Sequence, residues 1–311
     1  MMAGYLFALA ATAIWSGNFI IARGLNQSIP PISLAFWRWV VAVAALLPFA
    51  LKSLIDEWGA IKKNIPYLAV TSLLGVTLFN TFIYVAGHTT TAINISLICL
   101  TFPIFMVVLS RFFFQERITI NKGVGIMLVA GGVLLLIAKG AVSRLLSISF
   151  ATGDAWALLA AIIFAVYSIL LKKKPKQLSI WALQLSTFIL GLFFLFPFFI
   201  WEYMTAPSVE FDQTTILSIL YLGIFASLSA FILWNKAIAT VGPSKSGMIY
   251  YTLPLFSGFL AHLFLKEEIG MVHFFSMALI ISGILAANYE SRKQSAPIPL
   301  PITPRPHVRR P

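Results

Sequence analysis

The sequence predicts an all-α integral membrane protein with ten transmembrane helices arranged as two inverted five-helix repeats. Three observations lead to this fold class: an apolar composition, a series of long apolar runs, and a block of sequence that occurs twice. Of the 311 residues, 59% are hydrophobic and 10% are charged, and the mean hydropathy is +0.92. Soluble domains carry about 25% charged residues, so we expect lipid to be the solvent for most of this chain.

Ten apolar runs are long enough to cross a bilayer core, which takes about 20 helical residues. The runs are 3–22, 31–51, 66–87, 92–110, 120–138, 154–171, 179–201, 214–235, 244–264 and 270–288. Each run is continuous rather than alternating, and lipid requires backbone groups to be paired within one segment, so helices are preferred to a barrel. Short connectors with turn-forming residues separate the runs.

A block of sequence is repeated without a gap. The motif TFPIF at 101–105 returns 151 positions later as TLPLF at 252–256, and Glu116 and Gly132 return in the same frame as Glu267 and Gly283. Each copy holds five runs, an odd number, so the second copy must cross the membrane in the opposite direction. Inverted repeats of this kind are a known basis of alternating access.

The distribution of basic residues predicts the orientation. With the N-terminus placed in the cytoplasm, sixteen Lys and Arg fall on the cytoplasmic side and four on the other. The positive-inside rule then predicts an inner-membrane, multi-pass protein with both termini cytoplasmic. The formal charge of +12 belongs to loops and tail rather than to one amphipathic face, so we expect no nucleic-acid partner.

Two closing motifs carry a family resemblance. The sequence FFFQERIT at 112–119, followed by Gly125 and Gly131, resembles the end of an EamA repeat, and LFLKEEI at 263–269 through Gly283 is similar to it. WSGNF at 15–19 and FWRW at 36–39 resemble the family's opening half. The likeness covers residues 3–288.

The resemblance to EamA-type transporters of the drug/metabolite transporter superfamily implies ten helices, cytoplasmic termini and a central cavity lined by helices 1, 3, 4, 6, 8 and 9. It divides the chain into a first five-helix repeat at 1–140 and a second, inverted repeat at 141–290. The remaining residues, 291–311, are expected to form a disordered, basic, Pro-rich cytoplasmic tail, because they are too polar to pack a core.

Polar and aromatic residues within the cavity-forming helices are the candidate substrate-binding set. Such groups cost free energy in lipid and should face the protein interior. They are Trp15, Asn18, Asn80, Tyr84, Asn94, Tyr167, Trp234, Asn235, Ser246 and Tyr250. The i, i+4 spacing of Asn80 and Tyr84, and of Ser246 and Tyr250, places each pair on one helix face. Each residue alone fits a helix-to-helix hydrogen bond as well as a ligand contact.

Arg38 is the one basic residue well inside the second run, about 12 Å from its start at 1.5 Å per residue. An ionisable group at membrane depth is a functional candidate by default. The alternative is that its side chain extends to the outer surface, where water can solvate the guanidinium. Both interpretations are open at this point.

Four further residues are singled out by position. Pro103 and Pro254 are expected in the middle of helices 4 and 9, either as paired hinges or as static kinks. Glu116 and Glu267 precede helices 5 and 10, where a carboxylate complements the helix dipole, so a structural role is expected. Small residues are expected to pack helices 5 and 10 together; these are Gly131, Gly132, Ala278, Ser282, Gly283 and Ala286.

The leading hypothesis is an inner-membrane secondary transporter that exports a small metabolite, with an amino acid or related zwitterion favoured, by alternating access. A choline-like or drug-cation carrier is the first alternative, since aromatic faces can hold a quaternary amine. A membrane enzyme acting on lipid is the alternative from another class, although we find no catalytic constellation for it. We expect no enzyme activity, cofactor or metal, and the partners are a small-molecule substrate and the lipid bilayer, with a homodimer left open.

Overall fold

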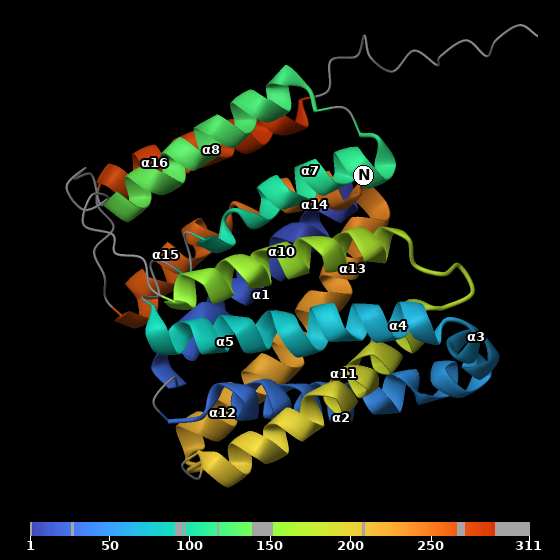
Figure 1. The fold of residues 1–311 in the computed structure, drawn as a ribbon. Coiled ribbons are helices and arrows are strands. Elements are labelled where there is room, and N and C mark those ends of the chain that lie inside the picture. Colours follow the sequence, from blue (N-terminus) through green and yellow to red (C-terminus); the bar gives the residue numbers. More distant parts are fainter. Residues whose placement is uncertain are drawn as a thin grey trace, which may run out of the picture.

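The computed structural model of the chain describes residues 2–25, 28–90, 95, 98–116, 118–138, 152–206, 209–265 and 271–289. Within these ranges every regular element is a helix (Figure 1). Two of the predicted site residues, Asn94 and Glu267, and the predicted tail at 291–311 lie outside the described residues.

The first repeat begins with two long helices and ends with two shorter ones. In chain order its elements are α1 (Met2–Leu25), α2 (Pro31–Asp56), α3 (Trp58–Lys63), α4 (Ile65–Ser72), η1 (Leu73–Leu78), α5 (Phe79–Thr89), α7 (Phe102–Phe114) and α8 (Ile120–Ala138). The short helix α3 is not among the predicted runs. The segment η1 is π-helical, so the span from α4 to α5 changes its helical pitch half-way.

The second repeat follows the same plan. Its elements are α10 (Thr152–Lys172), α11 (Ile180–Thr205), α12 (Gln213–Tyr221), η2 (Leu222–Ser229), α13 (Ala230–Val241), α14 (Pro243–Tyr250), α15 (Leu253–Leu265) and α16 (Met271–Asn288). The span from α12 to α13 again contains a π-helical segment, η2, in its middle.

Five continuous helical stretches have the length and apolar composition needed to cross a membrane. They are Pro31–Asp56, Ile65–Thr89, Thr152–Lys172, Ile180–Thr205 and Gln213–Val241. Shorter apolar helices occupy Phe102–Phe114, Ile120–Gly132 and Phe274–Ala287. All of these overlap predicted runs, whereas the full number of ten spans and the inversion of the second repeat stay predictions.

The exterior of the bundle is apolar and part of its interior is polar. Phe193 is 71% exposed and Trp201 62% exposed on the same helix, α11, while Gln184, also on α11, is 1% exposed. Side chains sort in this way when the surrounding solvent is hydrocarbon, because unpaired polar groups are costly there. The sorting supports lipid as the solvent for the spans.

The helices run side by side in a bundle that has two distinct edges. Figure 1 shows α8 and α16 together at one edge and α2 with α11 and α12 at the other, with α1, α5 and α10 between them. The end of α11 holds the start of α2, because the Glu202 carboxylate accepts hydrogen bonds from Ile32 N (3.1 Å) and Ser33 N (2.6 Å). This pairing of a carboxylate with the amides at a helix N-terminus fixes the helix that carries Arg38.

The contact between α8 and α16 depends on glycines, but not on the whole predicted set. A Cβ added at Gly283 would lie 2.6 Å from the carbonyl oxygen of Gly125, and one added at Gly132 would lie 2.9 Å from the carbonyl oxygen of Ser276. Gly131 faces open space, so its predicted role is wrong. Ala278 and Ser282 are likewise exposed and lie outside this contact. The helices are rotated so that Gly125, which we did not include, faces α16.

We predict that Gly283→Ala destabilises the protein and Gly131→Ala does not. The methyl group at position 283 would meet backbone atoms that cannot move aside, and such overpacking costs about 1–3 kcal/mol. Thermal unfolding of the purified protein in detergent is the measurement. Equal melting temperatures for the two variants would contradict this view of the α8–α16 contact.

Candidate functional site

The centre of the candidate site is the guanidinium of Arg38, which is fully buried. Its Nε donates to Ser227 Oγ of η2 at 2.7 Å, and its Nη1 donates to Asn80 Oδ1 of α5 at 2.9 Å. Nη1 also donates to Asn18 Oδ1 of α1 at 3.4 Å and to the hydroxyl of Tyr84. Arg38 therefore joins α1, α2 and α5 of the first repeat to η2 of the second. The alternative in which this side chain extends to the membrane surface is wrong.

All groups that pair with Arg38 are neutral. Within the described residues the one ion pair is Lys122–Glu116, so no described carboxylate compensates the guanidinium. Two rings lie near it: the Arg38 Cζ is 5.4 Å from the ring centroid of Trp39 and 5.8 Å from that of Tyr84. Among the described residues, the second terminal nitrogen, Nη2, has no hydrogen-bond partner, and neither does the side-chain nitrogen of Asn80. We call Asn18, Arg38, Asn80, Tyr84 and Ser227 the Arg38 centre.

A second polar cluster lies on helices of the second repeat. Tyr167 OH is 3.4 Å from Asn235 Oδ1, and Asn235 Nδ2 donates to Gln184 Oε1 at 2.5 Å. The Gln184 nitrogen has no partner in the described ranges. Nearby in sequence, Trp234 Nε1 donates to Ser168 Oγ at 3.0 Å. The structure thus brings together Tyr167 and Asn235, and adds Gln184.

An aromatic cluster surrounds Trp15. Its ring centroid lies 5.4 Å from those of Phe164 and Trp234, 5.8 Å from Phe231 and 6.2 Å from Tyr250. These rings come from α1, α10, α13 and α14, so the cluster, like the Arg38 centre, is built by both repeats. Edge-on and tilted ring pairs at these distances are favourable packing geometries. Trp15, Trp234 and Tyr250 of the predicted set meet here.

Two indole N–H groups pair with carbonyls of the π-helical segments. Trp39 Nε1 donates to Val76 O of η1 at 3.0 Å, and Trp15 Nε1 donates to Ala226 O of η2 at 2.9 Å. A π-helical turn is rare and is found mostly at functional sites. Both π-helical segments are therefore tied to tryptophans that border the site.

The two predicted hinge prolines lie at the starts of helices, directly after a break, rather than in mid-helix. Leu100 and Thr101 form a turn, and Pro103 lies in the first turn of α7. Tyr251 and Thr252 form the matching turn before α15, which contains Pro254. The expectation of a proline in mid-helix is corrected here, because a proline near a helix start removes no hydrogen bond that the helix needs.

Two remaining predicted residues, Ser246 and Glu116, differ in their surroundings. Ser246 Oγ donates to the carbonyl of Gly242 in its own helix at 2.8 Å, so it does not join either polar cluster. Glu116 pairs with Lys122 at 3.5 Å, whereas the start of α8 is capped by Thr119, whose Oγ1 accepts from Lys122 N at 3.3 Å. Glu116 thus forms an ion pair with a residue in the first turn of α8, and its structural role stays a prediction.

The i, i+4 spacing placed two site residues correctly, whereas three other residues at the site were not predicted. Asn80 and Tyr84 reach the same nitrogen of Arg38, as their i, i+4 spacing predicts. Sequence reasoning missed Ser227, Gln184 and Trp39. Gln184 could have been found as an isolated amide within an apolar run, but it lies on a helix outside the set that the family resemblance assigns to the cavity. Ser227 carries no such signal, since serine is common in membrane helices.

The sequence profile of the EamA-like transporter family matches residues 2–138 and 151–289. The chain belongs to this family. The two matched segments fall one in each repeat. Together with the apolar spans, the match makes the chain a multi-pass membrane transporter.

Similar proteins agree with the family and leave the solute unnamed. The uncharacterized transporter YetK of Bacillus subtilis is 28% identical over 301 residues, covering 95% of this chain and 89% of that protein. An uncharacterized transporter of Archaeoglobus fulgidus is 28% identical over 270 residues, covering 85% and 90%. One crystal structure superposes with a TM-score of 0.74 at 19% identity, covering 93% of this chain and 97% of the other, and shares the fold.

We predict that Trp39→Phe destabilises the protein more than Trp234→Phe. The first change removes the indole donor that reaches the buried Val76 carbonyl of η1 from another helix, and losing such a hydrogen bond costs about 0.5–1.5 kcal/mol. The second change releases only a serine hydroxyl, which can rotate to another acceptor. Chemical unfolding in detergent, followed by circular dichroism, measures the difference. An equal loss in both variants would show that the Trp39 bond to η1 carries no special weight.

Proposed function

We propose that this chain is a secondary transporter that moves a small metabolite across the cell's inner membrane by alternating access between two inverted repeats. We favour an amino acid or related zwitterion as the solute and export as the direction. The observation that carries the proposal is that both repeats interrupt their helices at equivalent positions. Shifted by 151 positions, η1 falls within η2, and the turn at 100–101 falls on the turn at 251–252.

The two turns have the same hydrogen bonds. Thr101 Oγ1 donates to Ile98 O at 2.6 Å, and Thr252 Oγ1 donates to Ile249 O at 2.8 Å. The backbone amides of Thr101 and Thr252 donate to the same two carbonyls, each at 2.9 Å. Such a match in detail supports two copies of one moving part, since a static kink in one copy would place no demand on the other.

Each interruption lies beside the candidate site. Ser227 of η2 belongs to the Arg38 centre, and Asn80 follows η1 by two residues. Phe102, next to Thr101, has its ring centroid 5.0 Å from that of Tyr250, which precedes the second turn. A change of backbone geometry at either place would alter the site directly, which is the coupling that alternating access requires.

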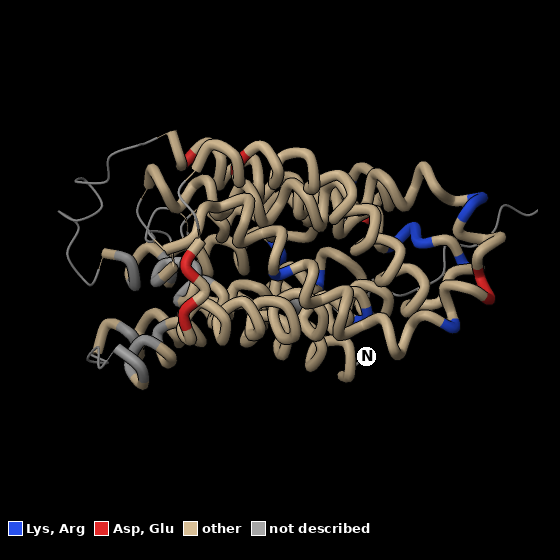
Figure 2. Tube along the Cα trace, turned by 90° about the horizontal axis from the view of Figure 1, so that it is seen from below, with Lys and Arg blue, Asp and Glu red and all other residues tan. Residues whose placement is uncertain are grey.

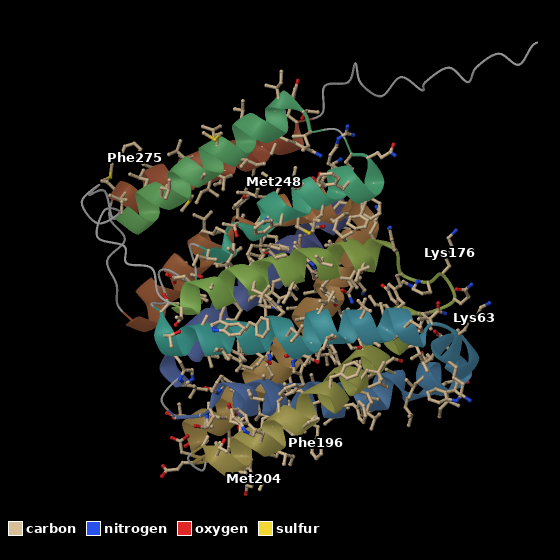
Figure 3. The ribbon with its side chains drawn as sticks, viewed as in Figure 1. Lys63, Lys176, Phe196, Met204, Met248 and Phe275 are labelled. Carbon is tan, nitrogen blue, oxygen red and sulfur yellow. The ribbon has the colours of Figure 1, made fainter. Side chains whose placement is uncertain are left out.

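The distribution of charge supports the proposed orientation. Figure 2 shows the described Lys and Arg gathered mainly toward one end of the bundle, with more of the Asp and Glu at the other. Lys63 of the first repeat and Lys176 of the second lie at the same end (Figure 3). Both were assigned to the cytoplasmic side from the sequence, so their common position supports cytoplasmic termini.

The Arg38 centre weighs against the cation-carrier alternative. The rings around Trp15 suit a quaternary amine, but a fixed positive charge without a carboxylate repels one. A lipophilic-cation exchanger would need a buried carboxylate at this position. A solute that has an acidic group suits both the positive charge of Arg38 and the rings around Trp15.

Counterflow in proteoliposomes tests the proposal. Vesicles containing the full chain are loaded with each member of a panel of amino acids and amines, and uptake of the labelled compound is followed. We expect saturable counterflow for at least one amino acid. If no member gives saturable flux and the purified protein instead converts lipid to a product, the membrane-enzyme alternative replaces the transporter.

We predict that the double variant Pro103→Ala with Pro254→Ala slows counterflow several-fold while leaving solute binding intact. Restoring the two backbone N–H groups would let α7 and α15 extend across the turns, which stabilises straight helices against the change of state. Pro48→Ala is the control, because Pro48 lies inside α2 on the exposed face of the bundle. Equal rates in both variants would contradict a moving role for the turns.

A further inference from the structure

We propose that Arg38 Nη2 and Asn80 Nδ2 together bind the carboxylate of the transported solute. This inference rests on the proposed function and specifies it: it assigns the end of the solute that is recognised, and the residues that recognise it. Every solute would then carry an acidic group, and a purely cationic compound would not be carried.

The hydrogen bonds within the Arg38 centre leave two donor groups unused. The acceptors on Asn18, Asn80, Tyr84 and Ser227 are already used by Nε and Nη1 of Arg38. What remains is two buried donor groups, Arg38 Nη2 and Asn80 Nδ2, which have no partner within the part of the chain that the structure describes. Buried donors are rarely left unpaired in folded proteins. A group with two acceptor sites, such as a carboxylate, can satisfy both.

The two unpaired nitrogens are held in the same part of the Arg38 centre. Nη2 is bonded to the same carbon as Nη1, and Asn80 Nδ2 is bonded to the same carbon as Oδ1; Nη1 and Oδ1 are 2.9 Å apart. The geometry therefore constrains both donors to one small region of the centre. A planar carboxylate has two oxygens, and arginine pairs with such groups through parallel hydrogen bonds.

The positive charge of the Arg38 guanidinium also favours an anionic ligand. A guanidinium buried beneath an apolar exterior costs free energy unless an anion compensates it. The described residues provide no ion pair to Arg38, and the four side chains that bond to it are neutral. A purely structural link between α1, α2, α5 and η2 could be made by a neutral amide at lower cost. The retained charge is explained if the compensating anion arrives with the solute.

The neighbouring rings limit the rest of the solute. Trp39 and Tyr84 flank the guanidinium, and the Trp39 ring centroid is 5.2 Å from that of Phe231, which also borders Trp15. The carboxylate end is thus polar and the adjoining surface aromatic. An amino acid with an apolar or aromatic side chain fits this combination, and so does a betaine.

The decisive experiment compares matched pairs of compounds by thermal shift on the full chain in detergent. The pairs are phenylalanine with 2-phenylethylamine and glycine betaine with choline, and inorganic phosphate tests whether any oxyanion suffices. A ligand that binds only the folded state raises the melting temperature. We expect a rise with the carboxylate member of a pair and none with its partner or with phosphate. Equal shifts within both pairs, or a larger shift with phosphate, would overturn the assignment of a carboxylate.

Arg38→Gln tests the residue. We expect the affinity for the carboxylate compound to fall about 10- to 100-fold, the range for a lost charged hydrogen bond, and the preference over the amine to disappear. Lys236→Gln is the matched control. It removes a basic residue that lies exposed on α13, with Nζ 5.7 Å from the ring centroid of Phe7, and should leave affinity and preference unchanged.

Asn80→Asp covers the case in which Arg38→Gln fails to fold. This isosteric change places a carboxylate beside Arg38 Nη1 inside the protein, so we expect a higher melting temperature without ligand and a loss of at least ten-fold in carboxylate affinity. Asn64→Asp, which changes a half-buried amide between α3 and α4, should do neither. If the Asn80→Asp variant binds carboxylates as well as the parent protein does, the subsite is refuted.

Counterflow separates failure of the subsite from failure of the transporter. Carboxylate binding that depends on Arg38 but gives no flux leaves the subsite standing and removes the proposed function. Flux of choline or 2-phenylethylamine that is unaffected by Arg38→Gln leaves the transporter standing and removes the subsite. Absence of any carboxylate-dependent shift in the parent protein also removes the subsite.

Discussion

The hydrogen bonds of the Arg38 guanidinium constrain more of this structure than any other polar contact described here. They reach Asn18, Asn80 and Tyr84 in the first repeat and Ser227 in the second. A charge that is buried beneath a lipid-facing exterior holds its partners strongly, because each would otherwise lose its pairing in a medium without water. The two repeats can therefore move apart only if the bonds to Arg38 are exchanged for others. In the proposed mechanism, a solute that brings new acceptors would provide such an exchange.

The π-helical segments place this centre where the backbone is least regular. In a regular helix every carbonyl is used within the span, whereas here Val76 O and Ala226 O accept from indoles of other helices. Irregular backbone at membrane depth is tolerated where it is covered by protein or lines a cavity. Trp39 and Trp15 thus have two functions at once: they pair the carbonyls of η1 and η2, and they border the Arg38 centre and the aromatic cluster.

The sequence predicted the spans and the duplication well, and the rotation of the helices poorly. Continuous apolar runs identify helices in lipid, and the two turns lie at equivalent positions of the 151-residue frame, although their prolines were expected in mid-helix. The i, i+4 rule placed Asn80 and Tyr84 on one face. Gly131 was assigned to a contact made instead by Gly125 and Gly132, because an evenly apolar helix such as α8 has no polar face to fix its rotation. The π-helical segments could not be foreseen, since one extra residue per turn leaves no periodic signal.

The repeats share their framework but not their chemistry. In the 151-residue frame Arg38 corresponds to Ile189, Asn80 to Phe231 and Asn18 to Ile169, so the charged centre exists in one copy only. Gln184 of the second polar cluster corresponds to Ser33 at the start of α2, so this amide too is present in one copy only. The turns and the π-helical segments are kept in both copies. The proposed alternating access requires such shared breaks, because both repeats have to change their backbone geometry in the same way. The features that differ are the ones that we propose to contact the solute, and a solute with unlike ends requires unlike surroundings. Symmetry in the breaks and asymmetry in the side chains are therefore what the proposed alternating access to a single, oriented site would demand of a duplicated chain.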